Sequence, residues 1–341
     1  MSDPLLNRTA EKQGTIRLFL RHHGDQMVPY IVLLIMIALT YFLMPWANLL
    51  SLDWLGIKTD QSLGLMLAAT GQSFVMLVKG VDLSIGGVIC MSNSISALYM
   101  STFLGGGTFG IIMMILAMAL MGFVCGSING FFIVRFRIQP FIATLATWSV
   151  WRGLALWILP TDGGDPPNAF IKFMLGRPAS IPMSLIFIIV LLLFWFYLKN
   201  TRFGVSIFAV GSNERGAYYN GINVKKVKIL VYSMSGMFAA LAGVFRTAQV
   251  ASGSPTAGNE FILLSFCAAV IGGINIAGGK GGILGTVIGA LIMKMLQDVL
   301  QFAGISTYWT ALFQGAILIT VVSITSFNII RNRKRRMEVK S

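Results

Sequence analysis

The sequence predicts an all-α, polytopic membrane protein with about ten transmembrane helices and both termini in the cytoplasm. Three observations support this prediction: the composition, a series of apolar runs, and the placement of basic residues. Of the 341 residues, 56% are hydrophobic and only 11% are charged, and the mean hydropathy is +0.78. Too few polar residues remain to cover ordinary soluble domains, so these values exclude a soluble protein of this length.

The apolar runs define the predicted spans, because a helix needs about 20 apolar residues to cross a hydrocarbon core of about 30 Å. Glycine, proline or charged residues separate one run from the next. The predicted spans are 28–46, 62–78, 85–103, 109–134, 140–159, 181–198, 229–248, 261–276, 283–301 and 309–330. The span at 62–78 is the most polar, so we expect it to face protein or a cavity rather than lipid.

Basic residues orient these spans. The net charge is +14, from 26 Lys and Arg against 12 Asp and Glu. With the termini inside, twenty basic residues lie on inner segments and three on outer ones; the remaining three, Arg152, Arg246 and Lys294, fall within spans. This bias follows the positive-inside rule, so the excess positive charge does not require a nucleic-acid partner.

The segments between and around the spans complete the predicted organisation. Residues 1–27 form a cytoplasmic N-terminal segment without a signal-peptide pattern. Residues 28–330 form the transmembrane domain, in which 199–228 is the longest cytoplasmic connection. Residues 331–341 form a basic cytoplasmic tail that lies near anionic lipid.

The residue patterns offer no enzyme chemistry. The chain has no H-E-x-x-H, G-x-S-x-G or P-loop motif, and its three cysteines lack metal-ligand spacing. Lys294 and Asp298 are four residues apart, which favours a local ion pair, with a gating or solute-contacting role as the alternative. We therefore expect neither a catalytic site nor a bound metal or cofactor in this chain.

Glycines recur at helix-packing spacing in two spans. A four-residue interval places them on one helix face and lets two backbones approach closely. A helix that slides during a transport cycle would show the same spacing. The two sets are Gly122, Gly126 and Gly130, and Gly281, Gly285 and Gly289.

The connection 199–228 contains signals for a short capped helix. Ser212 or Asn213 can cap its start, and Gly221 can end it. Such a helix on an otherwise bare membrane protein indicates either docking to a soluble partner or a merely solvated loop.

At these residues the chain resembles the ribose-type permeases of bacterial ABC importers. The matching segments occur in the family's order over roughly residues 60 to 330. They are Gly80-Val-Asp-Leu-Ser-Ile-Gly-Gly87, Gly122-Phe-Val-Cys-Gly-Ser-Ile-Asn-Gly130 with Pro140-Phe-Ile-Ala-Thr-Leu145, Thr201-Arg-Phe-Gly204, Ala209-Val-Gly-Ser-Asn213 with Gly221-Ile-Asn-Val224, and Ala269-Val-Ile-Gly-Gly273 with Gly281-Gly-Ile-Leu-Gly-Thr286. The chain departs from the family at Lys79-Gly80, where many relatives have two glycines, and at Gly216-Ala217, where two alanines are usual.

The resemblance implies a function and a set of partners. It implies a multi-pass permease in the bacterial inner membrane that takes up a sugar or a related small polar solute. The implied partners are two cytosolic ABC ATPase subunits, a periplasmic or lipid-anchored sugar-binding protein, and a second copy or a homologous permease. ATP and Mg²⁺ would then bind to the ATPase partner rather than to this chain.

The resemblance also suggests which residues carry these roles. The segment that would couple to the ATPase comprises Ser212, Asn213, Glu214, Arg215, Gly216, Ala217, Tyr218, Tyr219, Asn220 and Gly221. Polar residues within spans are candidates for the solute path, although each could instead bond neighbouring helices. They are Gln72, Asn93, Ser94, Thr144, Trp148 and Arg152.

Two other classes of function compete with the importer. A stand-alone secondary transporter would normally place an acidic residue or a broken helix at the membrane midplane, and the sequence shows no convincing acid there. An intramembrane enzyme would need a nucleophile and a base, and no such pair is visible. The sequence leaves open which sugar is carried and whether the permease pairs with itself.

Overall fold

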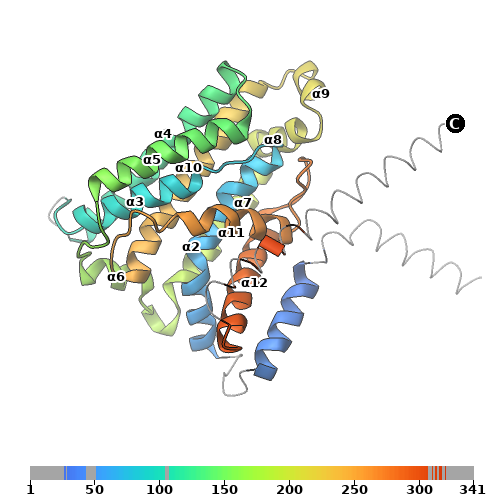
Figure 1. Cartoon of the computed structure of the whole chain (residues 1–341). Coiled ribbons are helices and arrows are strands. Elements are labelled where there is room, and N and C mark those ends of the chain that lie inside the picture. Colours follow the sequence, from blue (N-terminus) through green and yellow to red (C-terminus); the bar gives the residue numbers. More distant parts are fainter. Residues whose placement is uncertain are drawn as a thin grey trace, which may run out of the picture.

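The computed structural model describes residues 27, 29–43, 51–103 and 107–305, together with the helical residues 309, 312, 315, 316 and 319. These residues form a helical bundle (Figure 1). After a first helix at Pro29–Leu43, the elements in chain order are α2 (Leu52–Leu77), α3 (Ile85–Tyr99), α4 (Thr108–Arg135), α5 (Pro140–Ile158), α6 (Asn168–Leu175), a 3₁₀ turn (Pro178–Ser180), α7 (Met183–Lys199), α8 (Arg202–Ser212), α9 (Glu214–Tyr219), α10 (Val224–Val250), α11 (Asn259–Ile271) and α12 (Ile283–Phe302). The predicted span at 309–330 and both terminal segments lie largely or wholly outside the described residues.

Four described helices, α4, α5, α10 and α12, are long and apolar enough to cross a membrane. A fifth span results if α6 and α7, which meet at a 92° bend, are taken together. The predicted spans at 85–103 and 261–276 instead form α3, with 15 residues, and α11, with 13 residues. At 1.5 Å per residue these two helices are about 20 Å long, shorter than the hydrocarbon core.

Helix α10 occupies the centre of the bundle and packs against α2, α3 and α4. The closest approach is to α4, where Gly122 and Gly126 lie against the backbone of α10 at Gly236 and Tyr232. A Cβ placed on Gly130 would fall 2.7 Å from the Cα of Ile229, nearer than real side chains approach. The three glycines therefore share a face on which two backbones touch.

The second glycine set is divided between a helix and a loop. Gly285 and Gly289 lie on α12 against the backbone of α11 at Gly272 and Ala268. Gly281, however, precedes α12 and has a φ of +124°. This conformation favours glycine, so the role of Gly281 is in the turn rather than on the helix face.

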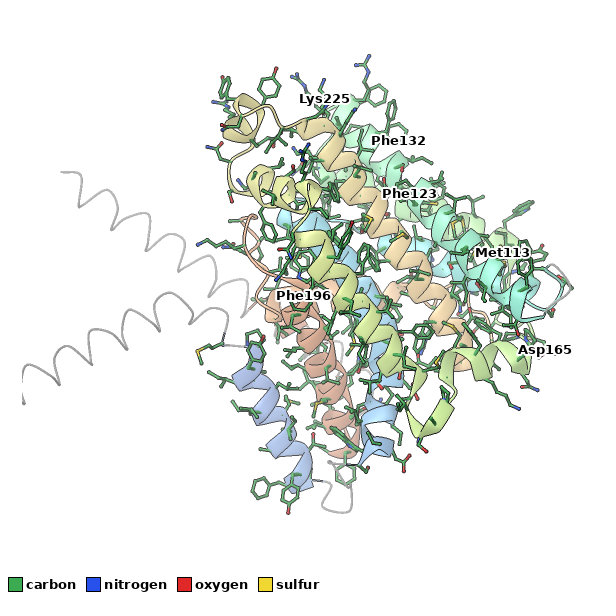
Figure 2. The ribbon with its side chains drawn as sticks, turned by 180° about the vertical axis from the view of Figure 1, so that it is seen from behind. Met113, Phe123, Phe132, Asp165, Phe196 and Lys225 are labelled. Atoms are coloured by element: carbon green, nitrogen blue, oxygen red, sulfur yellow. The ribbon has the colours of Figure 1, made fainter. Side chains whose placement is uncertain are left out.

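The two ends of the bundle differ in character. Helix α9 projects from one end, and α6 lies towards the opposite end (Figure 1). Figure 2 shows Lys225, at the start of α10, and Asp165, in the loop before α6, at these opposite ends. The distribution of basic residues predicts that the end that carries Lys225 is the inner one, and the words inner and outer are used below in this sense.

Candidate functional site

The segment predicted to couple to a partner folds as a short, separate helix. The side chain of Asn213 caps α9, because its Oδ1 accepts a 3.0 Å hydrogen bond from the backbone N–H of Gly216. Gly221, with a φ of +81°, follows the helix and turns the chain towards α10. Of the two capping residues that the sequence allows, the structure uses Asn213, whereas Ser212 is the last residue of α8.

The surface of α9 combines aromatic and charged groups. Tyr218 and Tyr219 are 69% and 83% exposed, and their rings meet edge to face at 6.0 Å. Lys228 on α10 pairs with Glu214 at 2.8 Å, which holds α9 against the start of α10. A cavity of about 950 Å³ opens between these segments, lined by both tyrosines, Arg215 and Lys225 among others. Large exposed aromatic rings beside basic groups are typical of a surface that binds another protein.

Two inner loops lie directly beneath this segment. The backbone N–H of Gly279 donates a 2.9 Å hydrogen bond to the carbonyl of Leu77. A Cβ on Gly211, near the end of α8, would fall 2.6 Å from the nitrogen of Gly279. Lys79 Nζ donates a 3.4 Å hydrogen bond to the carbonyl oxygen of Ser212. The end of α8 therefore rests on the loops 78–84 and 272–282, both of which contain segments that match the ribose-type permeases.

Behind the first of these loops lies a buried polar network, here called the inner hub. The Asp82 carboxylate accepts three hydrogen bonds. Ser84 donates two of them, from its backbone N–H at 2.9 Å and from its side-chain hydroxyl at 2.6 Å, and the Ser235 hydroxyl donates the third at 2.7 Å. Asn129 donates to the Ser84 oxygen at 2.6 Å, and Thr147 donates to the Asn129 carbonyl oxygen at 2.6 Å. The hub thus connects the loop beneath α8 to α4, α5 and α10.

The hub was not predicted from the sequence. Asp82 is only 1% exposed, and among the described residues no basic side chain lies within 4 Å of its carboxylate. Three donated hydrogen bonds compensate for its burial instead. One local signal was present, because an Asp followed two residues later by Ser at a helix start is typical of a side-chain-capped turn.

The residues predicted to line a solute path divide between buried positions in the bundle and half-buried positions on α5. Gln72, Asn93, Ser94 and Thr144 are buried in the bundle. Asn93 donates to Thr247 at 2.8 Å and accepts from the Ser254 N–H at 2.6 Å, so it bonds neighbouring segments. Thr144 donates to the carbonyl of Pro140 within its own helix.

The other two path candidates lie together on α5. The Arg152 guanidinium lies 5.5 Å from the centre of the Trp148 ring, and both residues are half-buried. The backbone of Trp148 also contacts α3, because a Cβ on Gly87 would fall 2.7 Å from the Trp148 carbonyl. All six residues stay predicted path residues, and two of them, Asn93 and Thr144, also make hydrogen bonds within the bundle.

The ionisable residues within the spans are arranged differently from the prediction. Asp298 does not pair with Lys294; it pairs with Lys58 of α2, which the fold brings alongside α12. Arg246 also has a partner on another helix, because its Nη2 lies 3.5 Å from Glu260 Oε1. Sequence spacing could not identify these partners, since each pair joins two helices.

Glu260 also changes the argument against a secondary transporter. The adjacent Phe261 ring lies 3.7 Å from a Cβ placed on Gly64, the thirteenth of the 26 residues of α2. The acidic residue Glu260 therefore adjoins a residue that packs at the middle of α2. The choice between transporter classes must rest on other observations.

Comparison with known proteins supplies the deciding observation. Residues 60–322 match the family model described as the permease component of the branched-chain amino acid transport system. The chain belongs to this family. Because this permease family matches most of the chain and the helices are apolar, the protein is a multi-pass membrane protein.

Several curated relatives of this permease are import permeases for sugars. The ribose import permease RbsC of Escherichia coli K12 is 35% identical over 300 residues, which cover 86% of this chain and 91% of the relative. The D-allose transport permease AlsC of the same strain is 34% identical over 266 residues, 77% of this chain and 80% of the relative. The galactose/methyl galactoside permease MglC of Haemophilus influenzae is 30% identical over 321 residues, 89% of this chain and 95% of the relative. No solved structure matches the chain.

Proposed function

We propose that this chain is the permease subunit of an ATP-driven, binding-protein-dependent importer of a sugar or a related small polar solute. The observation that carries the proposal is the near full-length similarity to the ribose import permeases, together with membership of the permease family. The ribose, allose and galactoside permeases above support a monosaccharide-sized, hydroxyl-rich solute. In such a system the permease forms the path, and the other components supply energy and selectivity.

The proposed topology has ten crossings, with both termini in the cytoplasm of a bacterium and the bundle in its inner membrane. Twenty basic residues on the inner segments against three on the outer ones support this orientation. The N-terminal segment 1–27, the transmembrane domain 28–330 and the basic tail 331–341 keep their proposed places in it.

We propose that α9 is the element that transmits force from a cytosolic ABC ATPase, to which ATP and Mg²⁺ bind. The exposed tyrosines, the Asn213 cap and the contact of α8 with two inner loops support this role. Movement of α9 would reach the inner hub through Lys79 and Ser212, and from there the three helices that the hub connects. The solute would arrive from an external sugar-binding protein and pass between this permease and a second permease subunit.

Reconstitution of the purified components in proteoliposomes tests the proposal. The ATPase and the binding protein encoded beside this permease are added or omitted one at a time, and uptake of radiolabelled ribose, allose and galactose is measured. We expect uptake of one sugar only when permease, ATPase, binding protein and internal ATP are all present. Accumulation by the permease alone would show a stand-alone secondary transporter instead.

A further inference from the structure

The connection between α10 and α11 returns into the bundle instead of staying at its outer end. After Ala251, with a φ of 54°, the backbone N–H groups of Ser254 and Gly258 donate to Asn93 and Cys90 of α3, at 2.6 Å and 3.2 Å. Gly258 thereby comes against Gly86, near the start of α3. Helix α11 consequently begins level with the middle of α2, as the contact between Phe261 and Gly64 shows.

Three ionisable side chains meet at this depth: Arg246 of α10, Glu260 of α11 and Lys294 of α12. They are called the charged cluster here. Arg246 Nη2 lies 3.5 Å from Glu260 Oε1, and Lys294 lies near enough for the charges of Glu260, Arg246 and Asp298 to act on it. Ionisable groups in the middle of a membrane protein are costly to place and rarely face lipid.

The cluster is nevertheless open at the surface of the subunit. The Glu260 side chain is 47% exposed and that of Arg246 is 28% exposed. Because a carboxylate in contact with hydrocarbon would be strongly unfavourable, this part of the surface faces water or polar groups in the membrane. The lipid-facing surface of α7 differs, since its exposed residues at similar depth, such as Leu193, are aliphatic.

The cluster also has unused hydrogen-bonding capacity. Arg246 Nε and Asn259 Oδ1 are buried atoms without a partner among the described residues. Lys294 has neither an ion pair nor a hydrogen bond within that part of the chain. The exposed Glu260 carboxylate and the Lys294 ammonium are an acceptor and a donor that the hydroxyl groups of a solute can use.

We propose that the charged cluster lines the solute path and contacts the hydroxyl groups of the transported molecule. This inference rests on the proposed function. Direct contact with a second permease copy is less favoured, because the Lys294 ammonium and the exposed Glu260 carboxylate leave a donor and an acceptor that a solute passing through can use in turn. The cluster would then be a transient contact, as conduction requires, rather than a tight binding site.

Thiol labelling tests whether water reaches the cluster. Glu260→Cys and Leu193→Cys are made in the full assembly and treated from outside with a membrane-impermeant, water-soluble methanethiosulfonate reagent. Because the thiolate reacts and forms only in water, we expect Cys at 260 to react about tenfold faster than Cys at 193. Cys90, Cys125 and Cys267 are buried, so the unmodified chain supplies the background. Equal rates at the two positions would overturn the proposal, as would disulfide formation between two copies at position 260 without labelling.

Uptake measurements test whether the solute uses the cluster. Loss of a hydrogen bond to a charged group corresponds to about tenfold in rate, so Glu260→Gln and Lys294→Met should each lower binding-protein-dependent uptake by about that factor. The matched control is Arg177→Gln, which breaks the exposed pair with Asp53 at the outer end and should leave uptake within twofold. Assembly yield should stay unchanged in all three variants.

The outcomes separate this inference from the proposed function. If ATP-dependent uptake is intact in the unmodified assembly and in both cluster variants, only the inference fails. If the unmodified assembly shows no ATP-dependent uptake, the proposed function fails. A parallel loss of assembly and uptake in the cluster variants would indicate a structural role and contradict the inference.

Discussion

The inner hub and the charged cluster handle buried charge in opposite ways. Asp82 has no basic partner among the described residues, but it receives three short hydrogen bonds and is almost fully covered. Glu260 has a basic partner, at 3.5 Å, yet remains half exposed beside polar atoms without a partner in the described part of the chain. The hydrogen bonds of Asp82 fix the positions of the helices that they join. The half-exposed Glu260 remains available for contact with a solute. The comparison teaches that satisfaction of hydrogen bonds, rather than charge alone, separates a structural site from a candidate solute contact.

The largest effect should come from removing the acceptor at the centre of the hub. Asp82→Leu leaves three buried donors without a partner, and we expect a loss of about 3 kcal/mol in stability. The measurement is the fraction of detergent-solubilised permease that stays monodisperse in size-exclusion chromatography after heating. Glu260→Gln is the comparison and should leave this fraction nearly unchanged. An equal loss in both variants would erase the distinction between hub and cluster.

Substitutions in α9 should interrupt the proposed transmission of movement from the ATPase to the inner hub. Gly216→Pro removes the N–H that bonds to Asn213, and a loss of about 1.4 kcal/mol would lower the population of ordered α9 tenfold. We expect uptake to fall by a similar factor while ATP hydrolysis and membrane insertion persist.

Charge reversal at Glu214 and Arg215 should also uncouple hydrolysis from uptake. Uptake equal to that of the unmodified assembly would mean that α9 is not the coupling element.

Removing one hydrogen bond to the Asp82 carboxylate should destabilise the permease less than removing the carboxylate itself. Ser235→Ala removes one donor to the Asp82 carboxylate, and we expect a destabilisation of about 1.5 kcal/mol, typical of a bond to a charged group. Ser73→Ala is matched, because Ser73 is equally buried and its hydroxyl lies 2.8 Å from that of Thr286, a neutral partner. That change should cost about 1 kcal/mol or less. Thermal inactivation of the two variants side by side would show whether the carboxylate makes the difference.

The smallest effect should occur at the outer surface. Asp53→Asn breaks the exposed pair with Arg177, whose contribution we expect to be under about 1 kcal/mol because solvent screens both charges. Its inactivation temperature should match that of the unmodified permease and should not respond to salt. A strong salt dependence would show that exposed pairs also hold this bundle together.

Much of the helical framework could be predicted because its signals are local. The predicted spans 140–159 and 283–301 agree with α5 and α12 to within one residue at each end. Pro140 at the start of α5 and Gly282 before α12 mark these boundaries in the sequence. The cap at Asn213 is likewise a short-range pattern that the sequence displays.

The features that were missed depend on distant parts of the chain. The return of residues 252–258 into the bundle is held by Asn93 and Cys90, which lie about 160 residues earlier. Lys58 replaces Lys294 as the partner of Asp298 for the same reason, since the fold places α2 beside α12. Spacing along one helix predicts neighbours on that helix only, so neither arrangement could follow from it.

The bare contact between α4 and α10 has a mechanical consequence. Where Gly122 and Gly126 bring the two backbones together, no flexible side chains lie between the helices to accommodate a shift. The pair should therefore travel as one stiff frame, and any rocking that opens the molecule alternately to its two sides must occur against this frame. The short helices α3 and α11, with the bent pair α6 and α7, are the segments left to supply that freedom.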